Sequence, residues 1–413
     1  MKQIIPALLI FQPFVNKLTI LLNFPFDVYN EMITLVVFLM YLLQVSRRGT
    51  IRSIALVALT LLAYMCFVVV LKNLYPLSFL QVGLYGQWFV YFLYYHGLDA
   101  EEKRETLVRI KSLLDIVLGL ILLITLFEIP FYKEFRDWLG LKTFGRGING
   151  FYLVSFFGSG ASLANFISFY VIIWFYFHYG IGFKIGKKDR IKLMVAFLIL
   201  VLSFSRKEVL FMFLFLLFFP FAYRSTINKW AKKTITLIGV VSGLLIYYIV
   251  FFSKANTVAL DDKYIRWRIV RKAVEILGDN MPWGTGVGTF GSKVSLMNTA
   301  IYEKYNIGPE MLGYKSLGQT RGPIYDAFLF TFTTEIGLGI LIFLFFFFKL
   351  FDSKTESTNR YKEYIKNFMV IYIIGLSVFQ PILLSSFGYL CAIFLGLSTG
   401  SISLLKFRTY AKN

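Results

Sequence analysis

Cationic side chains gather in one polar stretch of an otherwise apolar chain. Positions 264–272 read Tyr-Ile-Arg-Trp-Arg-Ile-Val-Arg-Lys, which places four cations and two aromatic rings within nine residues. A guanidinium group offers a rigid fork of N–H donors that matches the oxygens of a phosphate. The pattern predicts an anion site formed by Arg266, Arg268, Arg271 and Lys272. An ordinary solvated surface of a long loop is the alternative.

Two further positions have side chains suited to chemistry. The short polar run Ser-Phe-Ser-Arg-Lys-Glu at 203–208 separates two apolar segments, so Arg206 must lie at or near a membrane interface. It either binds an anion or extends its side chain to water beside Glu208. Asp326 stands at the start of an apolar segment, with Glu335 deeper in the same segment. We expect Asp326 to act as a general base or, alternatively, to cap the helix.

A glycine-rich run at 282–290, Pro-Trp-Gly-Thr-Gly-Val-Gly-Thr-Phe, lies between these groups. It lacks the strand–helix context of a dinucleotide site. Gly286 and Gly288 instead predict a tight turn whose backbone approaches a ligand or another segment. Trp283 lies at its beginning.

Metal and thiol chemistry find little support in the sequence. Cys66 and Cys391 fall inside apolar runs, and the two histidines, His96 and His178, lie at the ends of apolar runs. The chain has no HExxH, CxxC or P-loop motif. We therefore expect no metal and no cofactor.

The elements that position these groups are predicted to be membrane helices. Of the 413 residues, 57% are hydrophobic and 16% charged, and the mean hydropathy is +0.67. Apolar runs near 20 residues match the thickness of a bilayer. The sequence predicts an all-α, polytopic membrane protein of about twelve spans, at 4–23, 28–44, 53–71, 76–95, 112–129, 161–180, 192–205, 208–223, 234–252, 325–348, 367–383 and 386–405. We divide it into a first bundle (1–252), one large loop (253–324) and a second bundle with a tail (325–413).

Charge sets the expected orientation. Lysine and arginine concentrate in alternate short connections, which places those connections and both termini in the cytoplasm and the 253–324 loop outside it. That loop has ten basic and six acidic residues, hence a net charge of +4. Cytoplasmic basic residues facing anionic membrane lipid account for much of the overall +20, so no nucleic-acid partner is expected.

Within the loop, residues 266–277 predict an amphipathic helix lying on the membrane face. Its expected apolar face consists of Ile269, Val270, Ala273, Val274 and Leu277, and its cations lie opposite.

These motifs, in this order and topology, resemble the bacterial O-antigen polymerase and O-antigen ligase superfamily. The matching parts are Ser205-Arg206, 266–272, 282–290 and 326–337. The resemblance implies a GT-C-like, metal-independent glycosyltransferase of the bacterial inner membrane, acting on undecaprenyl-diphosphate-linked oligosaccharides. Ligases of this family carry His-Asn where this chain has Asp326-Ala327, which favours a polymerase.

The resemblance also implies roles for individual residues. Catalysis is assigned to Asp326 as base and to Arg206 and Arg268, which stabilise the leaving diphosphate. Substrate binding is assigned to the loop residues Arg266, Arg271, Lys272, Arg321, Trp267, Trp283, Tyr264, Gly286 and Gly288, with the aromatic rings suited to sugar stacking or to an interfacial belt. A chain-length regulator and a flippase of the same pathway are expected partners. A ligase, or a flippase of lipid-linked sugar, is the alternative function.

Overall fold

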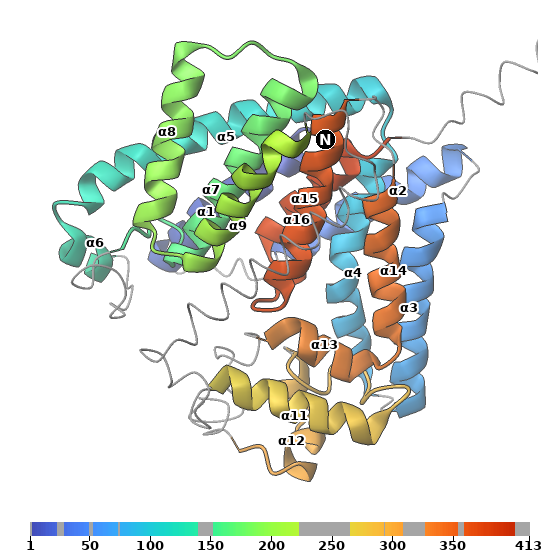
Figure 1. The fold of residues 1–413 in the computed structure, drawn as a ribbon. Coiled ribbons are helices and arrows are strands. Elements are labelled where there is room, and N and C mark those ends of the chain that lie inside the picture. The colour runs from blue at the N-terminus through green and yellow to red at the C-terminus, as the bar shows by residue number, and fades with distance from the viewer. Residues whose placement is uncertain are drawn as a thin grey trace, which may run out of the picture.

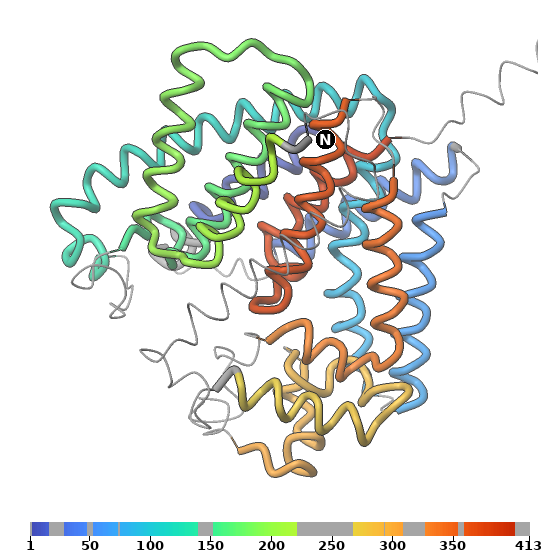
Figure 2. The backbone as a smooth tube through the Cα atoms, in the orientation of Figure 1, coloured from blue at the N-terminus to red at the C-terminus, as the bar shows by residue number. Residues whose placement is uncertain are grey.

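The structure of this chain is a computed structural model that describes residues 2–22, 29–48, 53–72, 75–138, 152–222, 265–292, 294–308, 327–353 and 359–400. Throughout these ranges the regular structure is helical and contains no strand (Figures 1 and 2). The prediction of an all-α protein is therefore confirmed for the described residues.

The helices divide into a long N-terminal series and a C-terminal series. The first consists of α1 (Ile4–Leu22), α2 (Tyr29–Arg48), α3 (Ser53–Lys72), α4 (Pro76–His96), α5 (Ala100–Glu128), α6 (Tyr132–Trp138), α7 (Gly160–Phe175) with its π-helical extension η1 (Tyr176–Ile181), α8 (Lys187–Leu202), α9 (Arg206–Phe218) and η2 (Phe219–Ala222). The second consists of α11 (Ile265–Asn280), η4 (Val294–Leu296), α12 (Ala300–Lys304), α13 (Phe328–Ile336), α14 (Gly339–Asp352), α15 (Arg360–Ser377), η6 (Ile382–Leu384) and α16 (Ser386–Ser398).

Four helical segments are long and apolar enough to cross a membrane: 29–47, 53–72, 100–128 and 160–181. Shorter apolar helices occupy 4–15 and 386–398. The membrane character is thus supported, whereas the twelve-span topology and its orientation remain predictions. The predicted span 234–252 lies outside the described residues.

One predicted span is divided in the structure. Residues 325–348 were expected to form one helix, but α13 ends at Ile336 and α14 begins at Gly339. Gly337 between them has φ +54°, a left-handed backbone conformation that favours glycine. In Figure 1, α13 lies across the lower end of α14 and does not continue it.

The main core lies between α4, α7, α15 and α16, whose side chains are largely buried. Outer helices instead expose apolar side chains: Leu35, Leu39 and Leu43 on α2 are each more than half exposed. Such a stripe is unfavourable in water and is the surface expected of a helix that contacts lipid.

Two ends of the bundle can be distinguished. We call "cap end" the end at which α4, α7, α9 and α16 begin, and "opposite end" the end at which α4 and α16 finish. At the cap end lies a smaller unit, which we call the cap: residues 265–292, 294–308 and 327–338. Its helix α13 contributes Phe328, Phe332 and Ile336 to the main core. The first part of α4 joins the two, because it packs against both η4 of the cap and η6 of the bundle.

The predicted amphipathic helix is present as α11, with a small core of its own. Ile269, Ala273 and Ile276 are buried against Phe290 and Tyr302. The predicted apolar face is partly wrong, because Val274 is 58% exposed and Ile276 takes its place inside. The buried face follows the cap's contact with α13 and the 282–290 loop.

Candidate functional site

The cap is held together by the carboxylate of Glu335, which is fully buried on α13. Its Oε1 atom accepts hydrogen bonds from three consecutive backbone amides, Gly288 (2.9 Å), Thr289 (3.0 Å) and Phe290 (3.1 Å). Its Oε2 atom accepts one from the Tyr85 hydroxyl of α4 at 2.9 Å. Successive amides arranged in this way form a binding concavity for anions. Here a side chain of the same protein occupies it.

The same loop also completes the end of α13. The last carbonyls of a helix have no partner within it and must find donors elsewhere. Thr285 N–H donates to Thr334 O and Gly286 N–H donates to Glu335 O, both at 3.0 Å. The Tyr64 hydroxyl of α3 donates to Ile336 O at 3.0 Å. A helix is thereby able to end next to the bundle without unsatisfied backbone groups.

Gly284 and Gly337 allow two backbones to touch. A Cβ atom at Gly284 would lie 2.6 Å from the carbonyl oxygens of Thr334 and Glu335. A Cβ atom at Gly337 would collide with the backbone of 282–284. The glycine-rich turn was predicted to approach a ligand or another segment, and the structure shows a segment, α13. The amides of Gly286 and Gly288 donate to Glu335, so their proposed contact with substrate stays a prediction.

The aromatic and cationic residues predicted to bind substrate surround this loop. Trp283 is partly exposed and packs against Phe67 and Tyr64 of α3, with ring centroids 5.5 and 6.3 Å apart. On α11, the Arg271 guanidinium lies 5.5 Å from the centre of the Trp267 ring. Lys272 pairs with Glu275 at 2.9 Å, and Arg268 is half-buried.

Several predicted residues cannot be placed. Tyr264, Arg321 and Asp326 lie outside the described residues. Arg266 belongs to the first turn of α11, but only its backbone is described. Asp326 directly precedes the described cap residue Ala327, which is buried.

The predicted Ser-Arg turn forms the start of α9 at the cap end. Ser205 is the N-cap residue, and Arg206 is exposed at the first helical position. The neighbour of Arg206, Lys207, was not predicted to have a role. Its Nζ atom lies 3.4 Å from Oε1 of the buried Glu208 and donates to Oε1 of Gln380 at 2.6 Å. Ser205 Oγ also bonds the Glu208 carboxylate.

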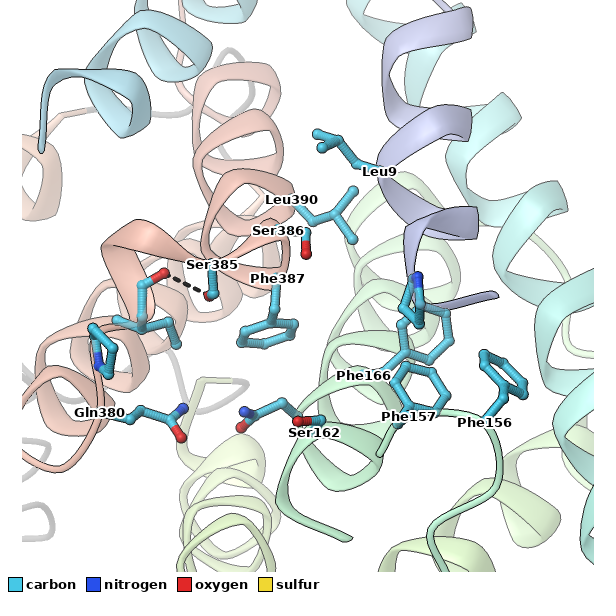
Figure 3. A pocket seen from close by; sticks show the side chains of 14 residues that line it. Leu9, Phe156, Phe157, Ser162, Phe166, Gln380, Ser385, Ser386, Phe387 and Leu390 are labelled. Carbon is cyan, nitrogen blue, oxygen red and sulfur yellow. Dashed lines mark hydrogen bonds between the residues drawn. The ribbon is translucent and has the colours of Figure 1, made fainter. Parts of the chain in front are cut away.

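Gln380 leads into a cavity of about 280 Å³ between the starts of α7 and α16 and the middle of α1 (Figure 3). Figure 3 shows phenyl rings of Phe156, Phe157 and Phe166 on one side and Gln380, Ser385 and Phe387 on the other. The lining residues are Leu9, Pro13, Phe156, Phe157, Ser162, Asn165, Phe166, Gln380, Pro381, Ile382, Ser385, Ser386, Phe387 and Leu390.

A second buried carboxylate fixes the segment that carries Phe156 and Phe157. Glu128, at the end of α5, accepts from Val154 N–H at 2.9 Å and Ser155 N–H at 2.7 Å. Arg136 of α6 lies 4.0 Å from Glu128, donates to Tyr152 O and lies over the Tyr152 ring at 4.1 Å. Leu153 N–H then donates to Leu202 O at 2.8 Å, which ties this segment to the turn before α9.

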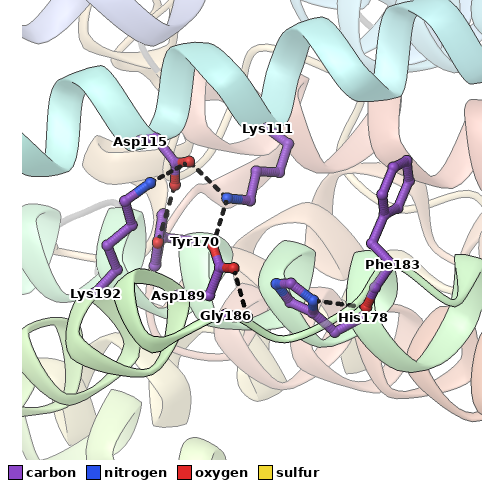
Figure 4. A network of polar contacts seen from close by, with 8 residues as sticks. All are labelled: Lys111, Asp115, Tyr170, His178, Phe183, Gly186, Asp189 and Lys192. Atoms are coloured by element: carbon purple, nitrogen blue, oxygen red, sulfur yellow. Dashed lines mark hydrogen bonds and ion pairs between the residues drawn. The ribbon is translucent and has the colours of Figure 1, made fainter.

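A different polar network lies toward the opposite end (Figure 4). Lys111 and Lys192 donate to Asp115 Oδ2 at 2.5 and 2.8 Å, and the Tyr170 hydroxyl donates to Oδ1 at 3.0 Å. These bonds join α5, α7 and α8. Lys111 and Lys192, which contribute to the basic charge of that end, therefore have a structural role.

The residues that the sequence analysis missed are Lys207, Gln380, Asn165, Glu128 and Arg136. Lys207 belonged to the polar run already identified at 203–208, so a signal for it existed. Glu128, Asn165 and Gln380 are single polar residues within or next to apolar segments, and Arg136 is one of several charged residues of α6. Only the fold brings them to the cap end. Among the described residues no group of three or more His, Cys, Asp or Glu side chains could hold a metal ion.

A comparison with protein families and characterised proteins finds no family and no individual protein that matches this chain.

Proposed function

We propose that this protein is a polysaccharide polymerase of the bacterial inner membrane, with a GT-C-like, metal-independent mechanism. It joins oligosaccharide repeat units linked to undecaprenyl diphosphate at the outer face of that membrane. Both termini lie in the cytoplasm, and the cap end faces outward. The family resemblance of the sequence motifs supports this proposal. A flippase and a chain-length regulator of the same pathway are its expected partners.

One structural observation carries the proposal furthest. At the cap end, a cation-bearing turn adjoins a cavity lined by amides, hydroxyls and aromatic rings, because Lys207 next to Arg206 bonds Gln380 of that cavity. A glycosyl transfer from a lipid diphosphate needs cations for the leaving group and neutral polar groups for the sugar. The cap adds Arg268, Arg271 and Trp267 at the same end.

The proposed reaction is a single displacement of diphosphate. A hydroxyl oxygen of the acceptor unit bonds the anomeric carbon of the donor, while the bond from that carbon to the diphosphate oxygen breaks. The proton of the hydroxyl passes to Asp326, and undecaprenyl diphosphate leaves with the electron pair. Arg206 and Arg268 stabilise the charge that develops on the leaving oxygen. Arg266, Arg271, Lys272 and Arg321 hold the diphosphate, and Tyr264, Trp267 and Trp283 stack against sugar rings.

The experiment that tests this function compares surface glycans of a deletion strain with those of complemented strains. We expect the deletion strain to cap its lipid with a single repeat unit. Unattached polymer would indicate a ligase, and loss of every outer-face product would indicate a flippase.

Complementation with variants then tests the mechanism at equal protein level. Arg206→Ala should abolish polymer and Arg206→Lys should restore only part, because an ammonium group lacks the fork. The N-cap position of α13 is Ala327. Asp326→Asn keeps the size and polarity of the side chain but should lower the rate by about 10²–10⁴-fold if Asp326 is the base. Arg190→Ala, at an exposed arginine of the opposite end, is the matched control and should leave polymer unchanged. Wild-type polymer from both Arg206→Ala and Asp326→Asn would refute the mechanism.

A further inference from the structure

The cavity between α1, α7 and α16 has a chemical character that differs from the cations beside it. Its fourteen lining residues include no charged side chain. Its polar members are two side-chain amides, Asn165 and Gln380, and three serines. A phosphate would require cations or a row of backbone amides. The lining is therefore suited to a neutral ligand.

The orientation of the Gln380 amide follows from its other partner. A lysine ammonium can only donate, so the Gln380 atom that Lys207 contacts at 2.6 Å must be the amide oxygen. The –NH₂ group of Gln380 is therefore left to donate to a ligand. The Asn165 amide, whose Oδ1 atom lies 3.5 Å from the Tyr372 hydroxyl, adds a second group that can both donate and accept. The cavity thus suits a ligand that is rich in hydroxyl groups.

Aromatic rings form the other part of the wall. Phe157 lies between Phe156 and Phe166, with ring centroids 4.5 and 5.2 Å apart. Across the cavity, Phe387 is fixed by edge contacts with Phe169 and Tyr372 at 6.0 and 6.3 Å. Rings held in this way present apolar faces, against which the C–H face of a sugar packs while its hydroxyls reach the amides.

The size of the cavity restricts the ligand to a small group. Its volume of about 280 Å³ is at the lower end of ligand sites, which span about 300–1,000 Å³. A stretch of isoprenoid chain would also fit by size, but it would cover the amides of Asn165 and Gln380 without giving them hydrogen-bond partners, which is unfavourable. A sugar ring would pack its C–H face against the phenyl rings and bond the amides through its hydroxyl groups.

We propose that this cavity binds one uncharged sugar ring of the lipid-linked substrate, with Asn165 and Gln380 as specificity-determining residues. The proposal rests on the proposed function for the identity of the ligand as a lipid-linked sugar. Lys207 connects the cavity with the turn that carries Arg206, because it belongs to that turn and orients the Gln380 amide.

The test is photo-crosslinking in the native host. A benzophenone amino acid replaces Phe387 in one strain and Leu9 in a second, both of which line the cavity. The matched control replaces Phe127 of α5, which is 66% exposed on the outside of the bundle. Cells are fed a radiolabelled sugar of the repeat unit and then irradiated. We expect labelled protein from the two cavity positions and none from Phe127.

Absence of label at both cavity positions, in strains that still make polymer and contain normal amounts of the protein, would overturn the sugar site and leave the proposed function standing. Crosslinking to a labelled isoprenoid without sugar would overturn it in the same way. Conversely, labelled sugar at Phe387 together with a deletion strain that makes normal polymer would support the sugar site and refute the polymerase.

A substitution that fills the cavity provides a second measurement. Ser386→Leu adds apolar volume at a lining position and should lower polymer yield at least tenfold, with crosslinking at Leu9 reduced in parallel. Folding is checked by the thermal unfolding of the purified protein. A folded Ser386→Leu variant that retains both full polymer and full crosslinking would overturn the proposal.

Discussion

The two ends of the molecule use buried charges differently. At the cap end two buried carboxylates, Glu335 and Glu128, accept hydrogen bonds from backbone amides of irregular loops, and the buried Arg136 stands beside Glu128. At the opposite end the buried charges include lysines bound by carbonyls at helix ends. Lys103 donates to Thr399 O at 2.6 Å, and Lys366 donates to the carbonyl oxygens of Phe351 (3.2 Å) and Ser353.

The difference follows from the backbone available at each end. A helix C-terminus presents unpaired carbonyls and a negative dipole end, for which a lysine is the matching partner. A loop that must run through a buried region has unpaired amides instead, for which a carboxylate is the partner. Lysines therefore close helices at the opposite end, whereas glutamates hold loops in shape at the cap end. The end that stabilises irregular backbone is the end that contains the cavity and the candidate site.

The largest expected effect comes from removing the loop anchor of the cap. Glu335→Ala leaves three buried amides without an acceptor, and we expect the free energy of unfolding of the cap to fall by about 3–5 kcal/mol. Limited proteolysis in detergent should then cut within 281–292. Tyr85→Phe is the control, because it removes only one of the donors to Glu335 and should cost about 1 kcal/mol. Resistance of Glu335→Ala to protease would contradict the anchoring role.

A smaller loss is expected at the other loop anchor. Arg136→Met removes the cation beside Glu128 and the donor to Tyr152 O but leaves the amides of Val154 and Ser155 in place. We expect a loss of about 2–3 kcal/mol, measured by thermal unfolding. Lys133→Met, an exposed cation of the same short helix, should be nearly neutral. Equal effects of the two variants would remove Arg136 from the anchor.

The third prediction concerns Lys366, which donates to carbonyl oxygens at the end of α14. Lys366→Met exposes the last carbonyls of α14 and should cost about 1.5–3 kcal/mol. Hydrogen exchange should increase in the last turn of α14, at 349–353, and remain unchanged in the cap loop. Lys188→Met, at an exposed position of α8, provides the control. Faster exchange in 282–290 would show that the two ends do not differ as described.

The smallest effect is expected from an ion pair that neither holds a loop nor bonds the end of a helix. Glu275 is half exposed and pairs with Lys272 on the surface of α11. Glu275→Gln should change stability by less than about 1 kcal/mol, and the change should vanish in high salt. A loss comparable with that of Glu335→Ala would mean that the cap depends on its surface charges.

The sequence was sufficient to predict the class of the fold and the presence of α11, because both depend on local composition and periodicity. Its failure at 325–348 has a specific cause. Apolar composition continues through Gly337, and only the backbone contact with 282–284 shows why the helix must break there. The burial of Ile276 in place of Val274 has the same origin, since tertiary contacts select which part of a helix faces inward.

The candidate site was predictable where its chemistry is continuous along the chain. Arg206 and the α11 cations belong to recognisable polar runs, and Lys207 lies in one of them. Gln380 and Asn165 gave no such signal, because each is a single polar residue near or within an apolar segment. The hydrogen bond between Lys207 and Gln380 joins two residues that are 173 positions apart in the sequence. Only the packing of α7, α9 and the turn between α15 and η6 brings them together.

The contact between Gly284 and Gly337 also determines how force passes through the molecule. Leu338 N–H donates to Pro282 O at 2.8 Å, so the start of α14 is bonded to the loop of the cap. The far end of α14 is held by Lys366 of α15. Because α14 is bonded at both ends, we expect displacement of the cap to move α14 with it and to change the contacts at the far ends of α14 and α15.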